Sequence, residues 1–278
     1  MKFIRPNDME GLFQNMEENN DRRYFLAGGT DINVQIKNGV IKNAEIIYIK
    51  HLKELNGIQI VKDDIVIGAV TNITEILNSK IIKENLPFFQ RSLESFASPL
   101  LQTSATIGGN IANGSPTADV VPLLLVLDAK LEIVSKTQTR IIELNNFFTG
   151  YKTNIMKTNE LIRSIIIPRK AENGFDTYFE KVGSRKSLMI SKVTLAGLKN
   201  ISHSKFTTVK LAVGSLNEYP RRLYKIEEYL TDKSLIEINF LKVEELLNEE
   251  ITPITDLRSD KEYRYHVCVN LIRTFLNE

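Results

Sequence analysis

The chain has 278 residues, and its 36 lysines and arginines nearly balance 34 aspartates and glutamates, which leaves a net charge of +2. So small a charge excludes general attraction to nucleic acid, and 42% hydrophobic with 25% charged residues excludes a long disordered chain. The single cysteine, Cys268, excludes an internal disulfide, a four-cysteine zinc site and an iron–sulfur cluster held by this chain.

The amino-terminal sequence "MKFIRPNDMEG" has no apolar stretch after its lysine and is therefore not a signal peptide. No apolar run approaches the length of a membrane span, so we expect a cytoplasmic protein without a transmembrane segment. "PNDMEGLFQNMEENN" predicts a first helix, capped by Asn7 or Asp8, with Leu12, Phe13 and Met16 facing inward.

A strand, a glycine turn, a helix and a second strand follow. Residues 24–27 predict a short buried strand, residues 28–31 a turn, and "DINVQIKNG" a short helix that stops at Gly39. Residues 45–49 predict the second strand. These elements form a βαβ-like unit within one small lobe, about residues 1–55.

The pattern then changes to that of a second lobe, about residues 56–170. Two β-branched runs around Lys62 predict a hairpin, and "TNITEIL" and "LPFFQRSLESFA" predict helices. A glycine-rich loop over residues 105–119 leads into a buried helix over residues 120–127. "AKLEIVS", "TRIIEL" and "ELIRSIIIP" predict three more strands, and Pro168 closes the lobe.

Residues 171–278 predict a separate α+β domain. "TYFEKVG", "SLMISKVTLAGLKN" and "FTTVKLAVGS" predict a three-stranded antiparallel sheet, and "IEINFLKVEELLNEE" and the carboxyl-terminal segment predict helices. In the last helix, an apolar face is predicted from residues four apart, namely Tyr263, Val267, Leu271 and Phe275. The pairs Arg22-Arg23 and Arg221-Arg222 are interpreted as ordinary solvated surface.

The stretch "AGGTD" lies between a strand and a helix, where backbone N–H groups form a natural anion cradle. Glycine permits a phosphate to reach these amides, Thr30 adds a hydroxyl, and Asp31 can cap the helix. The competing interpretation is a tight turn with no ligand.

"ATIGGNIANGSPTAD" is a longer stretch with few large side chains. It is either an Ω-type loop packed on itself or a ligand cradle, and its lack of side chains favours the ligand. Asp119 is either a helix cap or an acceptor for ribose or ribityl hydroxyls. Because neither glycine stretch holds a lysine, we expect a pyrophosphate held by amides. The candidate contacts here are Ala105, Thr106, Gly108, Gly109, Asn110, Ala112, Asn113, Ser115 and Asp119, with Thr117 as a further hydrogen-bonding side chain.

Other signatures of catalysis are missing from the sequence. It contains no G-x-G-x-x-G, P-loop, nucleophile elbow or H-E-x-x-H, and His51, His203 and His266 have no partner spacing. We therefore assign no catalytic side chain and no metal ligand. The basic residues Lys181, Arg185, Lys186 and Lys192 are either a solvated strand face or a group in which Lys192 points into a cleft and stabilises a reduced flavin.

The motifs "FLAGGTDINVQIK", "ATIGGNIANGSPTAD" and "SRKSLMISKVTLAG", in this order and spacing, resemble the FAD-binding medium subunit of the molybdenum hydroxylases. That family includes xanthine, carbon monoxide and nicotinate dehydrogenases. The resemblance covers nearly the whole chain and extends to "SLNEYPRRLYKIEEYL". It implies a two-lobed FAD-binding domain of the vanillyl-alcohol-oxidase/PCMH type, followed by the carboxyl-terminal domain.

The resemblance also implies roles for individual residues. The turn matching Leu26, Ala27, Gly28, Gly29, Thr30, Asp31 and Ile32 wraps the FAD pyrophosphate, and Ala105, Thr106, Gly109 and Asn110 line the other side. Asp119 would bond cofactor hydroxyls, Leu161 or Ile162 would cover the flavin, and Lys192 would lie near its ring. Phe96 matches a position that often touches the cofactor. In place of an arginine–asparagine pair that many members carry, this chain has Gln102, Thr103 and Ser104.

The resemblance implies an electron-transfer subunit. FAD would receive electrons from iron–sulfur clusters on a small subunit, after oxidation of substrate on a large molybdopterin-binding subunit, and pass them to NAD or another acceptor. A self-contained FAD-dependent reductase of related fold is one alternative, but the sequence shows no proton donor for it. A redox-silent scaffold is another, but a scaffold has no need of bare amides.

Overall fold

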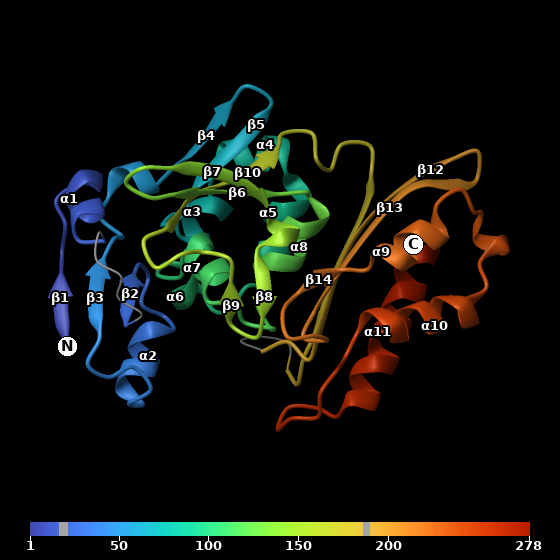
Figure 1. The fold of residues 1–278 in the computed structure, drawn as a ribbon. Coiled ribbons are helices and arrows are strands. Elements are labelled where there is room, and N and C mark those ends of the chain that lie inside the picture. The colour runs from blue at the N-terminus through green and yellow to red at the C-terminus, as the bar shows by residue number, and fades with distance from the viewer. Residues whose placement is uncertain (17–21, 186–189) are drawn as a thin grey trace.

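The structure is a computed structural model that describes residues 1–16, 22–185 and 190–278. Figure 1 shows a small amino-terminal lobe, a central lobe and a carboxyl-terminal layer of sheet and helices arranged side by side, with the central lobe in the middle. The predicted α+β class is confirmed, because separate helices and largely antiparallel sheets make up the described chain.

The small lobe is a three-stranded parallel sheet with order β1-β3-β2 and two short helices. Its elements are β1 (Lys2–Ile4), α1 (Met9–Gln14), β2 (Arg23–Leu26), α2 (Ile32–Lys37) and β3 (Glu45–Tyr48). Asp8 caps α1 by accepting from the Gly11 amide at 2.8 Å, and α2 is followed by Gly39 at φ +70°, both as predicted. The end of the predicted first helix lies outside the described residues.

The prediction of a buried strand at residues 24–27 is wrong in one respect. The strand β2 ends at Leu26 and is half-buried along its length, because Tyr24, Phe25 and Ala27 line a cleft rather than a closed core.

The central lobe is an antiparallel sheet of order β4-β5-β10-β6-β7, covered by helices. Its strands are β4 (Ile58–Val61), β5 (Asp64–Gly68), β6 (Lys130–Val134), β7 (Thr139–Glu143), β8 (Phe148–Gly150), β9 (Thr153–Asn154) and β10 (Leu161–Pro168). Its helices are η1 (Lys53–Leu55), α3 (Ile73–Leu77), α4 (Lys80–Asn85), α5 (Pro87–Leu93), α6 (Pro99–Gln102), α7 (Ile107–Ala112), α8 (Val120–Val126) and η2 (Leu144–Asn146).

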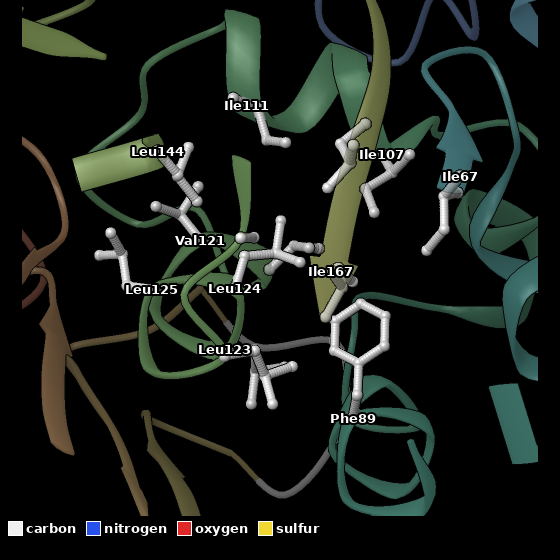
Figure 2. Packing of buried hydrophobic residues seen from close by; sticks show 14 of the residues in the cluster. Ile67, Phe89, Ile107, Ile111, Val121, Leu123, Leu124, Leu125, Leu144 and Ile167 are labelled. Carbon is white, nitrogen blue, oxygen red and sulfur yellow. The ribbon is translucent and has the colours of Figure 1, made fainter. Parts of the chain in front are cut away.

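The helix α8 forms the centre of this lobe. Every residue from Val120 to Val126 is buried, and Figure 2 shows Leu123, Leu124 and Val121 packed among side chains from the sheet and the neighbouring helices. Burial of a helix on all sides explains why its sequence is apolar throughout.

The predicted loop over residues 105–119 is not a loop at its centre. Residues 107–112 form the helix α7, whose amino terminus is capped by Thr106, and Ile107 and Ile111 anchor it in the core. The two glycines do not prevent a helix here, because Thr106 caps its amino terminus and the two isoleucines four residues apart lie on one face of it.

The carboxyl-terminal part contains a sheet of order β11-β12-β13-β14, with helices on one face. Its elements are β11 (Asp176–Val182), β12 (Val193–Ser202), β13 (Lys205–Gly214), β14 (Arg221–Arg222), α9 (Tyr224–Leu230), η3 (Leu235–Glu237), α10 (Phe240–Glu250) and α11 (Lys261–Asn277). The three predicted strands are present, but the second begins at Val193 rather than at Ser187, and residues 187–189 of its predicted range lie outside the described residues. The two-residue β14 extends the sheet by a fourth strand. One face packs on α8 through Ala196, Leu198 and Ala212, and the other face packs on the helices.

The predicted apolar face of the last helix is wrong. The buried face of α11 runs through Arg264, Cys268 and Ile272 to Phe275, one residue away from the predicted face, and Tyr263 is exposed. Arg264 is tolerated there because it donates to the carbonyls of Lys192 and Ser215 and to Asp256.

The interpretation of the two arginine pairs as solvated surface is wrong for one arginine of each pair. Arg222 is buried in a two-pronged ion pair with Glu227. The Arg23 side chain is buried against Glu45.

Within the described residues, the structure contains no helix that is long and apolar enough to cross a lipid bilayer.

Candidate functional site

A cleft of about 560 Å³ opens between the small lobe and the central lobe. Three segments form its walls: the β2–α2 region, the helix α7 with Phe96, and the segment that follows β8. The lining residues are Arg23, Tyr24, Phe25, Ala27, Gly28, Gly29, Thr30, Asp31, Ile32, Gln35, Phe96, Ala105, Thr106, Gly109, Asn110, Ala112, Asn113, Lys152, Asn154, Met156, Lys157, Thr158 and Glu160.

The two glycine stretches meet at the floor of this cleft. A Cβ placed on Gly28 would overlap the Ser104 carbonyl oxygen and lie 2.7 Å from its carbon, so only glycine fits. Gly29 adopts φ +73°, which lets the chain turn into α2. The sequence therefore uses glycine here for close backbone approach as well as for the turn.

The first glycine turn presents free backbone donors. Among the residues that the structure describes, none accepts a hydrogen bond from the amides of Gly28, Gly29 or Thr30. Asp31 occupies the cap position of α2 but makes no side-chain cap, because it accepts instead from the Gln35 side chain. The open amides fit a negatively charged ligand group such as a phosphate.

The second stretch contributes differently from the prediction. Its amides are already used, because Gly108 donates to the Ala69 carbonyl at 2.9 Å and Gly109 to the Thr106 hydroxyl at 3.2 Å. Gly109 instead leaves open space: a Cβ there would meet only Thr106 Oγ1 within 4 Å. The expectation that amides from both stretches hold a pyrophosphate is thus limited to the first stretch.

Asn110 provides an independent indication of a ligand. Its Oδ1 atom is buried and has no hydrogen-bond partner among the described residues, although buried polar atoms are normally paired. A ligand N–H or O–H group in the cleft would satisfy this oxygen. Open amides, an uncovered glycine and an orphaned acceptor in one elongated cleft together fit a dinucleotide.

Some predicted site residues lie outside the lining. Leu26 packs in the small lobe, Gly108 against Ala69, and Ser115 Oγ pairs with Thr117 Oγ1 at 3.0 Å. Leu161 and Ile162 are buried in the core, with exposed fractions of 3% and 5%.

Asp119 and Lys192 also lie outside the lining. Lys192 Nζ lies 5.0 Å from the centroid of the Tyr263 ring. Lys186, predicted to belong to the same basic group, lies outside the described residues.

Asp119 does not cap α8 with its side chain. Its carboxylate accepts from Lys181 Nζ at 2.6 Å and from Ser191 Oγ at 2.7 Å. Burial raises the pKa of Asp119, and the ion pair with Lys181 only partly offsets this effect. Lys181 also donates to the carbonyl of Ser95, next to the cleft residue Phe96, so among the described lysines of the predicted basic group the buried Lys181 approaches the cleft.

The sequence did not predict the segment after β8 as part of the site, nor the lining residues Arg23, Tyr24, Phe25 and Gln35. The segment after β8 brings Lys152, Lys157 and the buried carboxylate of Glu160 to the cleft. No glycine motif marks it, and its only local signal is the polar turn before the apolar β10 strand. Near the glycine stretches, Gln102 occupies the place where the resemblance expected arginine or asparagine, and its Nε2 donates to the Phe96 carbonyl at 2.8 Å.

Comparison with known proteins gives a consistent result over the whole chain. Residues 1–170 match the family described as FAD binding domain in molybdopterin dehydrogenase, and residues 178–278 match the CO dehydrogenase flavoprotein C-terminal domain. The xanthine dehydrogenase FAD-binding subunit of Escherichia coli O157:H7 is 28% identical over 95% of this chain and 91% of its own length. The glyceraldehyde dehydrogenase medium chain of Sulfolobus acidocaldarius is 26% identical over 95% of this chain and 93% of its own length.

Solved structures show the same fold. A carbon monoxide dehydrogenase chain from Hydrogenophaga pseudoflava superimposes with a TM-score of 0.93 over 100% of this chain and 96% of its own length, at 23% identity. The predicted two-lobed architecture with a carboxyl-terminal domain is therefore confirmed.

Proposed function

The chain belongs to the family of FAD-binding domains in molybdopterin dehydrogenases, and on that premise we propose that it is the electron-transfer subunit of a molybdenum hydroxylase complex. Its cofactor is FAD, and it is an oxidoreductase subunit. The observation that carries the proposal is the cleft between the lobes, which is lined by residues 28–30 with their open amides, by the uncovered Gly109 and by Asn110, whose buried Oδ1 is unpaired among the described residues.

The residues of the cleft would bind and orient the cofactor. The amides of Gly28, Gly29 and Thr30 would hold its pyrophosphate, Gly109 would allow close contact, and Asn110 Oδ1 would accept from a cofactor N–H or O–H group. When bound, FAD supplies the ability to accept electrons singly and to release them in pairs. The protein side chains would then need only to position the cofactor and exclude water. In the described part of the chain, the residues that line the cleft include no histidine or cysteine.

We further propose the route of the electrons and the partners. Iron–sulfur clusters of a small subunit would deliver electrons that a large molybdopterin-binding subunit removes from substrate, and NAD or another acceptor would receive them. The relatives support this route because their names describe subunits or medium chains of dehydrogenases. Purification of the tagged chain from its own cells should yield both partner subunits, and purification of the chain alone would contradict the proposal.

We also propose that residues 1–170 form the FAD-binding domain and residues 171–278 a carboxyl-terminal domain. Two hydrophobic clusters in and beside the small lobe, and a separate cluster between the carboxyl-terminal sheet and its helices, support this division. The roles of Leu161, Ile162 and Lys192 next to the flavin stay predictions.

The alternatives differ in one assay. A redox-silent scaffold would have no NADH:dye reductase activity after incubation with FAD, whereas the proposed subunit that uses NAD would have it. A stand-alone reductase would be active without partners and would need a proton donor in the cleft. Among the residues that the structure describes, the lining contains no cysteine and no serine to serve as that donor.

A further inference from the structure

The cleft lining carries five charged side chains in the part of the chain that the structure describes. Arg23 is neutralised by Glu45 at 2.8 Å, and the half-buried Asp31 accepts a hydrogen bond from the uncharged Gln35 side chain. Lys152 and Lys157 add positive charge at the exposed part of the lining. The carboxylate of Glu160 differs from that of Asp31 because it is buried, with 4% of the residue exposed.

A buried carboxylate is an unusual wall for a site that binds an anion. The FAD pyrophosphate carries two negative charges, and like charges repel strongly where water is excluded. Glu160 is acceptable in this position only if another group cancels its charge. The structure provides that group from β7.

Arg140 stands behind Glu160, outside the lining, and makes a two-pronged ion pair with it. Its Nε donates to Glu160 Oε1 at 3.0 Å and its Nη2 to Oε2 at 2.8 Å. Nη2 also donates to the Ile155 carbonyl at 3.2 Å, and the Lys157 amide donates to Glu160 Oε2 at 2.8 Å. A fork of this kind fixes both geometry and charge.

We propose that Arg140 is a positioning residue for the cofactor, because its ion pair with Glu160 cancels the charge of the buried carboxylate among the described residues that line the cleft. The inference rests on the proposed binding of FAD in this cleft. Burial alone would raise the pKa of Glu160, but the hydrogen bonds from Arg140 and the Lys157 amide lower it, so Glu160 is ionised at neutral pH. Arg140 thereby acts through Glu160 and does not itself touch the ligand site.

A purely structural role of the ion pair makes a different prediction. If the pair only braced the turn of residues 155–160, removal of either partner would loosen the wall and weaken FAD binding. If Arg140 cancels charge, the two removals have opposite effects. Loss of Arg140 leaves an unpaired carboxylate in the wall of a cleft that binds an anion, whereas loss of the carboxylate leaves an extra cation.

The test is a titration of the full-length apoprotein with FAD, followed by flavin fluorescence, for wild type and three variants. Arg140→Gln should raise the Kd for FAD by about tenfold or more, because a buried charge loses its partner. Glu160→Gln should bind FAD within about threefold of wild type or more tightly, and the double variant should recover most of the affinity that Arg140→Gln loses. Arg163→Gln, which breaks the Arg163–Glu132 pair of 3.8 Å on β10, is the matched control and should bind FAD as wild type does.

The pH dependence of the Kd for FAD provides a second measurement, which would not change if the ion pair only braced the turn of residues 155–160. The charged groups that act on Glu160 are Arg140 and Lys157, and removal of Arg140 leaves burial to raise the pKa of Glu160. The Kd of Arg140→Gln should therefore improve relative to wild type as pH falls from 8 to 5.5. Equal weakening by Arg140→Gln and Glu160→Gln, or no effect of Arg140→Gln, would overturn the proposal. If Arg140→Gln does not fold, weaker binding by Glu160→Gln alone overturns it, and failure of wild type to bind FAD refutes the proposed function instead.

Discussion

Gly28 and Ser104 are in backbone contact across the base of the cleft, so close that a Cβ on Gly28 would overlap the Ser104 carbonyl. This contact joins the β2–α2 turn of the small lobe to the segment that leads into α7 of the central lobe. The two walls of the cleft can approach this closely because residue 28 is a glycine and has no Cβ.

Gly28→Ala should open this contact. The added Cβ meets backbone atoms, which cannot rotate away, so we expect a lower melting temperature and loss of most FAD affinity. Circular dichroism melts and flavin titration would measure both effects. Gly11→Ala is the control, since its Cβ would meet only Asp8 Oδ1 at 3.3 Å and Pro6 Cβ at 3.7 Å, and it should leave FAD affinity unchanged.

Substitutions of the neighbouring residues Gly108 and Gly109 should have different effects, the first on stability and the second on FAD binding. A Cβ on Gly108 would lie 2.7 Å from the Ala69 carbonyl oxygen, so Gly108→Ala should destabilise the fold by about 1–3 kcal/mol. Gly109→Leu would disturb only the Thr106 hydroxyl within the protein, at a cost of about 1 kcal/mol for the cap, but would fill the cleft. We expect a folded protein without bound flavin, and tight flavin binding by Gly109→Leu would show that the cleft wall is assigned wrongly.

Lys181→Met should destabilise the protein in a pH-dependent way. Removal of the cation leaves Asp119 buried without its partner, which costs about 3–5 kcal/mol at pH 7. Burial already raises the pKa of Asp119 and would then raise it further, so the protonated form favours the folded state. The deficit should therefore be largest at neutral pH and shrink as pH falls through the raised pKa towards the unfolded value.

Urea unfolding at several pH values would measure this deficit. Lys130→Met breaks the exposed pair with Glu143 at 3.3 Å and should cost less than about 1 kcal/mol at every pH. A deficit in Lys181→Met that does not change with pH would contradict the role assigned to Asp119.

Cys268 should be inert in the folded protein. It is fully buried, and burial raises the pKa of its thiol to about 12. Thiol reagents should modify it at neutral pH only after unfolding, which mass spectrometry with and without denaturant would detect. Rapid modification of the native chain would contradict the packing of α11.

Much of the fold could be predicted because its signals are local. The βαβ unit, the hairpin around Lys62 and the buried helix α8 follow from hydrophobic period and turn residues. The face of α11 was misplaced because buried Arg264 interrupts its apolar pattern. A helix can bury a cation when backbone carbonyls receive it, and no local pattern shows that those carbonyls come from Lys192 and Ser215.

The sequence predicted those parts of the site that have a local signal and missed those that depend on contacts with distant segments. The glycine stretches are visible in the sequence, but their different uses are not, because the acceptors that occupy the Gly108 amide and the backbone that meets Gly28 come from other segments. Glu160 and Arg140 lie 20 residues apart and meet only when β7 and the start of β10 join one sheet. The ion pair between Arg140 and Glu160 therefore depends on the tertiary fold, and the sequence pattern could not predict it.

The binding of FAD in the cleft is tested most directly by the flavin content of the purified full-length chain. We expect a yellow protein, or a colourless apoprotein that gains the flavin absorption bands with one FAD per chain. We also expect Gly109→Leu to lose that binding. A folded chain that remains colourless and leaves the spectrum of added FAD unchanged would contradict the assignment of the cleft.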